Sequence, residues 1–159
     1  KDGDLRLAIH QSQDLATNQE VKFEGDRLYV NRANARAEIR EFYEKEGKKN
    51  LLVLVEKIAQ EMELKPSQVL FRSMKSRWGS CSTTGIVTLN WRLVVFPEML
   101  QSYVVTHELA HLQHADHSPR FWQLVEKHCR NYKICRRYLA DHQYEVDFLA
   151  KRSDLYIDE

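Results

Sequence analysis

The segment that most constrains the fold of this 159-residue chain is THELAHLQHADHSPRFW, residues 106–122. His107 and His111 lie four residues apart, so on an α-helix their side chains share one face, with Cβ atoms about 6 Å apart. Pro97 and Glu98 come shortly before this segment, and both suit the first turn of a helix, where the backbone dipole favours a carboxylate. The segment therefore predicts a helix that presents two imidazoles on one face.

Glu108 follows the first of these histidines and lies about 100° farther around the helix axis. This is the H-E-x-x-H arrangement, in which two histidines bind zinc, the zinc acidifies a water molecule and the glutamate takes its proton. A catalytic zinc ion has three protein ligands and one open position, so the chain needs a third ligand. Glu108 is the predicted catalytic base.

His117 is the predicted third ligand. It lies six residues after the second histidine, a spacing that one helix cannot bring to the same face, so the chain has to turn. Ser118 and Pro119 suit the N-cap and the first position of a new helix, which provides that turn. The spacing is similar to that of metzincin peptidases, which have glycine where this chain has His114. Glu126, in the following helix, is the alternative third ligand.

The rest of the sequence predicts strands and helices in separate blocks. Residues 4–31 contain the strand-like runs LRLAIH, VKF and RLYV, the last two joined by the turn residues Gly25 and Asp26. Residues 34–62 carry apolar residues at helical spacing, with Gly47 as the point where the helix would kink or split. VLFRSM and GIVTLNW are typical of strands separated by a loop over residues 79–85, and a last helix is expected over about 135–150. This order predicts an α+β fold rather than repeated βαβ units.

Charge and cysteine content exclude several classes of protein. The net charge is +1, so bulk charge indicates no acidic partner, and no apolar run reaches the roughly 20 residues of a membrane span. Three cysteines without a C-x-x-C pair favour reduced thiols in the cytoplasm over a disulfide framework or a thiolate zinc site. No signal peptide is visible. Because the first residue is Lys1, the chain is expected to be a fragment.

Four motifs in order resemble a known family. They are RWGSCS, LNWRL, VVTHELAHL and HSPRFW, and the stretch over about residues 35–149 resembles the YgjP-like predicted metal-dependent hydrolases. The resemblance implies one catalytic zinc ion, kinship with the SprT-like and minigluzincin peptidases, and a zincin-like metallopeptidase fold. That fold has a small mixed or antiparallel sheet, a long N-terminal helix, an active-site helix and C-terminal helices. The resemblance assigns the zinc to His107, His111 and His117, and the role of base to Glu108.

The resemblance also implies how the chain is divided. Residues 32–159 are expected to form the zincin-like metallopeptidase domain, and residues 1–31 an N-terminal β segment. Members of the family usually carry more N-terminal β-structure than this chain. The segment is therefore expected to be the end of a larger β region.

These observations predict a zinc metallopeptidase that hydrolyses peptide bonds in a protein or peptide substrate. A zinc hydrolase of a non-peptide amide is one alternative, because its active centre would look the same. The other alternative is a DNA- or protein-binding module with structural zinc. That module would need a fourth protein ligand, for which His114 and Asp116 are the nearest candidates.

Several flanking residues carry a functional and a structural interpretation. Residues 85–91, GIVTLNW, form either a sheet edge that binds the substrate backbone or a plain core strand. Asn90 would bind a substrate amide or cap a turn, and Tyr132 would polarise the scissile carbonyl or lie in the core. Cys81 is disfavoured as a nucleophile because loop and strand follow it, whereas a reactive thiolate needs a helix N-terminus or a paired histidine.

Basic residues in the segment CRNYKICRRY, residues 129–138, with Lys75 and Arg77, make DNA association a further hypothesis. Charged helix faces are more often simply solvated, and the near-neutral net charge argues against it. The sequence predicts no oligomeric state.

Overall fold

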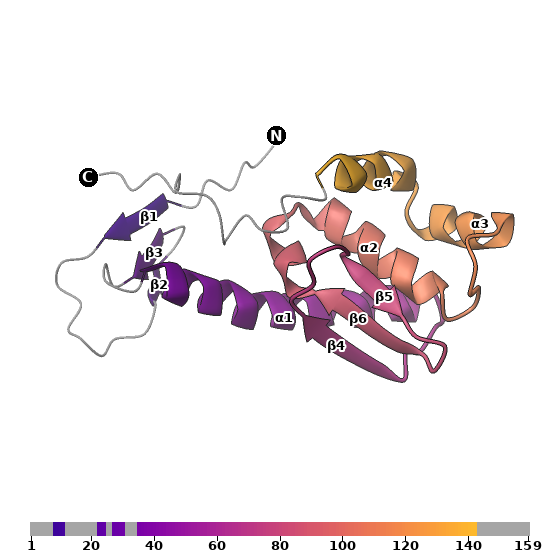
Figure 1. The fold of residues 1–159 in the computed structure, drawn as a ribbon, viewed down its shortest axis with the longest axis horizontal. Coiled ribbons are helices and arrows are strands. Elements are labelled where there is room, and N and C mark those ends of the chain that lie inside the picture. Colours follow the sequence, from indigo (N-terminus) through magenta and orange to yellow (C-terminus); the bar gives the residue numbers. More distant parts are fainter. Residues whose placement is uncertain (1–7, 12–21, 25–26, 31–34, 143–159) are drawn as a thin grey trace. The chain divides into compact units, whose positions relative to one another are not determined.

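The computed structural model describes residues 8–11, 22–24, 27–30 and 35–142, and Figure 1 labels their helices and strands. The boundary between two compact units falls between residues 43 and 44, within helix α1 (Ala35–Glu61). The strands that precede this boundary belong to the first unit, and the described residues after it belong to the second. The domain boundary predicted at residue 31 stays a prediction.

The first unit contains a three-stranded sheet with the order β1-β3-β2, formed by β1 (Ala8–Gln11), β2 (Lys22–Glu24) and β3 (Arg27–Val30). Strand β1 is parallel to β3, and β2 is antiparallel to it. The strands predicted within residues 4–31 are confirmed at these positions. The predicted turn at residues 25–26 lies outside the described residues.

Helix α1 runs for 27 residues without a break at Gly47. The prediction that Gly47 interrupts the helix is wrong, and the packing explains the glycine. A Cβ atom at this position would lie 2.9 Å from Cγ1 of Val94, which belongs to the short 3-10 helix η1 (Trp91–Val95). Glycine is required here for a close approach of two elements.

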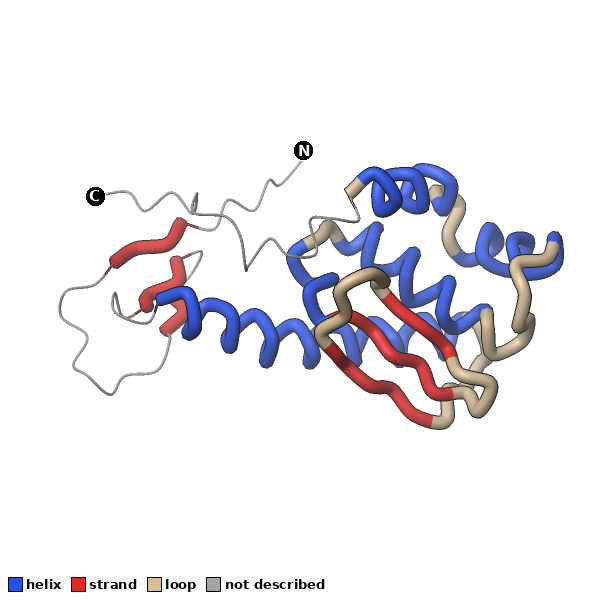
Figure 2. The backbone as a smooth tube through the Cα atoms, in the orientation of Figure 1, coloured by secondary structure: helices blue, strands red, loops and turns tan. Residues whose placement is uncertain are grey.

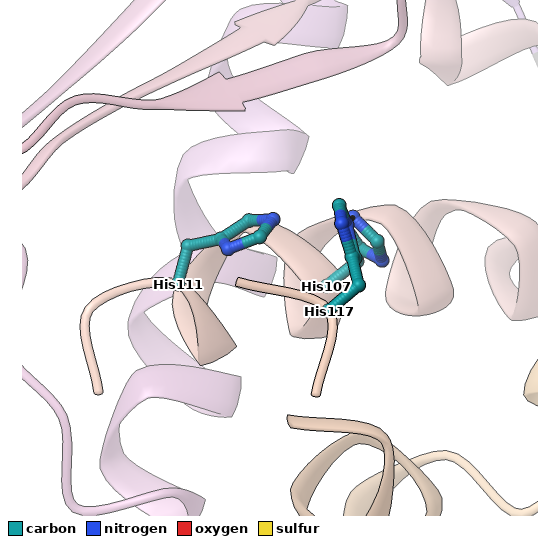
Figure 3. A group of neighbouring side chains, drawn as sticks. All are labelled: His107, His111 and His117. Atoms are coloured by element: carbon teal, nitrogen blue, oxygen red, sulfur yellow. Dashed lines mark hydrogen bonds between the residues drawn. The ribbon is translucent and has the colours of Figure 1, made fainter. Parts of the chain in front are cut away.

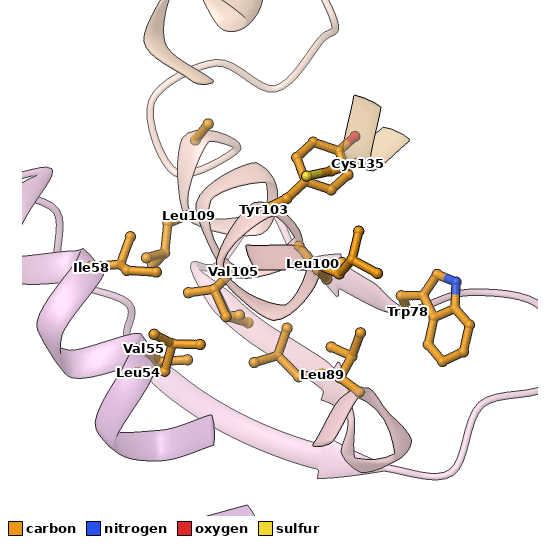
Figure 4. Packing of buried hydrophobic residues seen from close by; sticks show 14 of the residues in the cluster. Leu54, Val55, Ile58, Trp78, Leu89, Leu100, Tyr103, Val105, Leu109 and Cys135 are labelled. Carbon is orange, nitrogen blue, oxygen red and sulfur yellow. The ribbon is translucent and has the colours of Figure 1, made fainter. Parts of the chain in front are cut away.

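One face of the second half of α1 enters the hydrophobic core (Figure 4). Leu51 is fully buried, whereas its neighbour Leu52 is 39% exposed, so the core face follows a narrower stripe than the apolar pattern suggested. The buried residues recur at intervals of three and four, as a helix face requires; they are Leu51, Leu54, Val55, Ile58, Ala59 and Met62.

The sheet of the second unit differs from the predicted one. It comprises β4 (Gln68–Arg72), β5 (Gly79–Cys81) and β6 (Ile86–Asn90) in the order β4-β6-β5. Strand β6 is central, parallel to β4 and antiparallel to β5. Of the two alternatives for residues 85–91, the sheet edge is therefore wrong and the core strand is confirmed. The loop predicted around Gly79 is a strand instead, because pairing with β6 overrides the weak strand preference of Gly and Ser.

Three further helices complete the unit: α2 (Glu98–Ala110), α3 (Pro119–His128) and α4 (Tyr132–Asp141). Helix α2 contacts β5 on one side and α3 and α4 on the other (Figure 2). Ser118 is the extended N-cap residue of α3, with Pro119 in its first turn, as predicted. Helix α4 begins earlier than the predicted residue 135, and residues 143–150 lie outside the description.

The core lies between α1, α2 and the sheet. Val87 and Leu89 of β6 and Val105 and Leu109 of α2 are fully buried, and Figure 4 shows side chains of these elements meeting. The predicted α+β class with a small mixed sheet, a long N-terminal helix and C-terminal helices is confirmed. None of the helices among the described residues combines the length and apolar character that a membrane crossing requires.

Two adjacent leucines of α1 provide a test of this packing. Leu51→Ala should lower the free energy of unfolding by about 2–5 kcal/mol, because it removes a buried side chain and leaves a cavity. Leu52→Ala is the matched control and should cost about 1 kcal/mol or less, since this side chain is partly exposed. Urea unfolding of both variants measures the difference, and equal losses would contradict the assigned core face.

Candidate metal centre

Three histidines converge at the end of α2 (Figure 3). His107 lies in the last turn of the helix, His111 is its C-cap residue, and His117 comes shortly before α3. One ring nitrogen from each lies within 4.8 Å of the others. The helical spacing that places the first two on one face continues to the helix end, because His111 still has helical backbone angles, φ −65° and ψ −18°.

The turn that returns His117 to the helix end is made without glycine. The amide of His114 donates to the carbonyl of Ala110 at 3.0 Å, which closes the helix, and the amide of Ser118 donates to the Asp116 carboxylate at 3.3 Å. Among the described residues, the only non-glycine residue with a positive φ is Glu63. His114 therefore fits the bend without a left-handed conformation.

Hydrogen bonds set the roles of the ring nitrogens. Nδ1–H of His111 donates to the carbonyl of His114 at 3.0 Å, which leaves Nε2 with its lone pair free for a metal. The Nε2 atoms of His107 and His117 lie 3.1 Å apart. Two nitrogens bound to one zinc ion in tetrahedral geometry lie roughly 3.3 Å apart, so the spacing of this pair fits such an ion.

An aromatic layer supports the three imidazoles. Phe121 of α3 is fully buried and its ring centre lies 4.9, 4.6 and 4.8 Å from those of His107, His111 and His117. Trp122 stacks on the His117 ring at 5.6 Å with an interplanar angle of 24°. The motif HSPRFW therefore brings both a histidine and the side chains that hold the histidines in position.

The environment keeps at least two of the imidazoles neutral. Burial, with contributions from His111, His117 and Arg136, lowers the pKa of His107 to about 3. Burial also lowers the pKa of His117, again with His111 and Arg136 contributing. Neutral imidazole is the form that binds a metal ion, because a protonated ring has no free lone pair.

The other candidate ligands do not join this group. Within the described part of the chain, the cluster of His, Cys, Asp and Glu side chains contains the three histidines and neither Glu126, His114 nor Asp116. Asp116 is fully exposed and bonded to Ser118. The structure brings together three imidazole nitrogens, with no carboxylate or thiolate of the described residues in the same group, and a metal ion held by these three nitrogens would keep an open position.

Glu108 lies beside the first histidine on α2 and is 7% exposed. Burial raises the pKa of its carboxyl group to about 8, and the nearby Arg77 opposes this shift. Gly79 of β5 packs against the carboxylate so closely that a Cβ atom there would lie 2.6 Å from Oε1. Only glycine leaves room for the glutamate side chain at this point.

A cleft of about 440 Å³ runs along β5 past the histidines. Its walls comprise Arg77, residues 79–83, Ala115, the three histidines and Glu108. Cys81 faces this cleft, but burial and the Glu108 charge raise the pKa of its thiol, so it stays protonated and is a poor nucleophile. The free edge of the sheet nearest the histidines is β5 rather than the predicted β6.

Asn90 and Tyr132, for which the sequence left a substrate-binding and a structural role open, make structural contacts. Asn90 is fully buried; its amide donates to the carbonyls of Met74 and Arg77 at 2.9 and 3.3 Å, and its oxygen accepts from the amide of Arg92 at 3.2 Å. It caps η1, the alternative that the sequence left open. Tyr132 is 8% exposed and belongs to the hydrophobic core, where it stacks on Trp122.

Sequence reasoning missed Gly79, Phe121 and Trp122 as parts of the site. Both aromatics lie within five residues of His117, and the 3.6-residue period of a helix that starts at Pro119 would have turned a face of α3 toward the histidines. No local signal connects Gly79 with Glu108, because the two meet only when β5 packs on α2.

Two solved structures are similar to the chain. The metallopeptidase zymogen of Pyrococcus abyssi abylysin is 25% identical, with a TM-score of 0.49, and the match covers 58% of this chain and 95% of that one. The metallopeptidase zymogen of Methanocaldococcus jannaschii jannalysin is 22% identical, with a TM-score of 0.48, and the match covers 57% and 96%. No curated protein matches the chain.

The description of the matching family model is "YgjP-like, metallopeptidase domain", and the match spans residues 1–142. It extends farther toward the N-terminus than the motifs alone suggested, and it includes all three histidines, Glu108 and the β5 edge. The chain belongs to the YgjP-like metallopeptidase domain family and is a metal-dependent hydrolase.

Proposed function

We propose that the chain is a zinc peptidase whose metal ligands are His107, His111 and His117 and whose general base is Glu108. The observation that carries this proposal is the convergence of three imidazole nitrogens within 4.8 Å, with no fourth described ligand. Closed structural zinc sites have four protein ligands, whereas catalytic sites have three. The geometry therefore favours catalysis over a structural zinc.

When bound, zinc would lower the pKa of a water molecule toward neutrality and polarise the scissile carbonyl. Glu108 would accept the proton of the attacking water on its carboxylate and later pass it to the leaving amine. Its burial supports this role, because burial raises the pKa of the carboxyl group and makes the carboxylate a stronger base. The aromatic layer of Phe121 and Trp122 would hold the imidazoles and exclude water from their far side.

The substrate backbone would pair with β5. The residues that flank this strand bond to β6: the carbonyl of Trp78 accepts from the amide of Asn90, and the amide of Ser82 donates to the carbonyl of Ile86. Alternation along an antiparallel strand then directs the backbone groups of Gly79 and Cys81 to the free edge. An extended peptide adding there would gain backbone hydrogen bonds directly above Glu108. This geometry favours a protein or peptide substrate over a small non-peptide amide.

The assignment of the third ligand is testable with two histidines of the same segment. His117→Ala should weaken zinc binding by more than about 100-fold, since the loss of even an outer-shell partner costs 10–100-fold. His114→Ala is the matched control and should have little effect, because its backbone carbonyl, not its ring, bonds to His111. Competition with a chelator measures both affinities, and the reverse ranking would exclude this ligand set.

We expect substitution of Glu108 to reduce turnover without reducing metal binding. Glu108→Gln keeps the size of the side chain but removes the proton acceptor, so the variant should fold, retain about one zinc per chain and lose at least ~100-fold in turnover. Elemental analysis and cleavage of a quenched-peptide library that the wild type cuts provide the two measurements. Undiminished turnover would rule out the mechanism, and loss of zinc would instead make Glu108 part of the metal site.

The contact between Gly79 and Glu108 generates a second test of the base. Gly79→Ala places a methyl group 2.6–2.8 Å from Cγ, Oε1 and Cδ of Glu108, so the side chain has to leave its position. Displacing a reacting group by about 1 Å can cost roughly 100-fold in rate. We expect such a loss with unchanged zinc content.

Gly85→Ala is the control for this substitution. Gly85 has φ +80°, and its nearest neighbours are Ser67 and Leu112 rather than Glu108. This variant should lose stability through backbone strain but keep the turnover of the folded protein. Thermal unfolding and peptide cleavage of both variants distinguish the two effects; full activity in Gly79→Ala would show that Glu108 does not act from its observed position.

A further inference from the structure

A second cavity, of about 250 Å³, opens on the other side of Glu108. It lies between the segment that leads into β5, the middle of α2 and the end of α4. Its walls include Trp78, Tyr103, Arg136 and Leu139. Arg77, Gly79, His107 and Glu108 line both this cavity and the main cleft, so the two cavities meet at the proposed base.

The cavity combines apolar walls with two guanidinium groups. Trp78, Tyr103 and Leu139 are buried, whereas Arg77 and Arg136 are exposed. Neither arginine forms an ion pair within the described part of the chain. Glu108 is the single carboxylate in the wall, so the positive groups outnumber the negative ones where a substrate side chain would enter.

Arg136 makes an aromatic contact beside the cavity. Its guanidinium carbon lies 4.8 Å from the ring centre of Trp122, the residue that also stacks on His117. A guanidinium held over an aromatic ring keeps its hydrogen-bond donors directed sideways, and it loses less conformational freedom when it binds an oxyanion. The contact with Trp122 therefore distinguishes Arg136 from a charged residue on a helix face that contacts only solvent.

We propose that this cavity binds an anionic oxygen group of the substrate, a carboxylate or a phosphate, on the residue next to the scissile bond, and that Arg77 and Arg136 determine this specificity. The proposal rests on the proposed peptidase function for the position of the scissile bond. Guanidinium groups match both oxyanions through paired N–H donors. A neutral or cationic side chain would leave the two positive charges unpaired.

The first experiment compares peptides that differ only in charge. A library of N-blocked, C-amidated peptides carries Glu, Gln or Lys at each position in turn, and mass spectrometry locates the bonds that the zinc-loaded protein cuts. The wild type should show a Glu-to-Gln ratio of kcat/KM of about tenfold at one position beside the scissile bond, as expected for a charge-assisted hydrogen bond.

Substitutions at two adjacent arginines identify the cause of that preference. Arg136→Gln should reduce the Glu-to-Gln ratio to about twofold or less, and Arg136→Glu should favour Lys instead. Arg137→Gln is the matched control, because Arg137 pairs with Asp141 at 3.9 Å and is absent from the cavity wall. If Arg136 variants slowed all peptides equally, the arginine would act on the scissile carbonyl or on the fold, and the proposal would be overturned.

A binding measurement separates this proposal from the peptidase function. N-acetyl-glutamate α-amide and N-acetyl-glutamine amide are titrated into the zinc-loaded protein and followed by tryptophan fluorescence. The carboxylate probe should bind about tenfold more weakly to Arg136→Gln than to the wild type or to Arg137→Gln. An equal affinity in all three proteins would overturn the cavity assignment, because direct binding to zinc would not depend on Arg136.

Failure of the anion site and failure of the peptidase function give different results in these experiments. If the probe depends on Arg136 but no peptide is cut, the peptidase function fails and the anion site stands. If peptides are cut without a charge preference and the affinity of the probe does not depend on Arg136, the anion site fails and the peptidase function stands. Peptides with glutamate, phosphoserine or a free C-terminal carboxylate at the preferred position then identify which oxyanion the cavity takes.

Discussion

Helix α2 contributes side chains to both the hydrophobic core and the candidate metal centre, and the other elements of the second unit pack around it in a way that allows both. Val105 and Leu109 are fully buried in the core, while His107 and Glu108 lie between them in sequence and line the cleft. A helix allows this because residues one and two apart point in different directions. The sheet covers one side of α2, and α3 and α4 cover the other (Figure 1), so the core packing that fixes the helix also fixes the histidines.

The parts of the site that the sequence predicted are those set by local geometry. The spacing of His107 and His111 fixes their common face, and the Ser118–Pro119 start of α3 returns His117 to them. The sequence left a substrate-binding and a structural role open for Asn90 and Tyr132, and the burial of both favours the structural role. The edge position considered for β6 is wrong, because the strand order depends on long-range packing. Strand β5 has only three residues, all small, so its place at the sheet edge follows from pairing that local propensity does not reveal.

The contact between Gly79 and Glu108 couples the two halves of the proposed mechanism. Strand β5 would hold the substrate backbone, and Glu108 would move the proton, so the distance between them sets how the peptide bond meets the base. The absence of a side chain at Gly79 lets the strand approach to where a Cβ would be 2.6 Å from the carboxylate. The requirement for glycine at position 79 in RWGSCS is therefore steric, and it does not depend on the backbone flexibility of glycine.

The two arginines beside the cleft have a consequence for Glu108 itself. Arg77 already opposes the rise in the pKa of this carboxyl group. An anionic substrate group in the neighbouring cavity would repel the ionised carboxylate, but two unpaired guanidinium groups within the same walls would offset that repulsion. Because both arginines are exposed, salt would screen their attraction for a distant substrate more than their effect on a bound one. The charges would thus contribute most after water has been displaced from the cavity, when the base has to accept its proton.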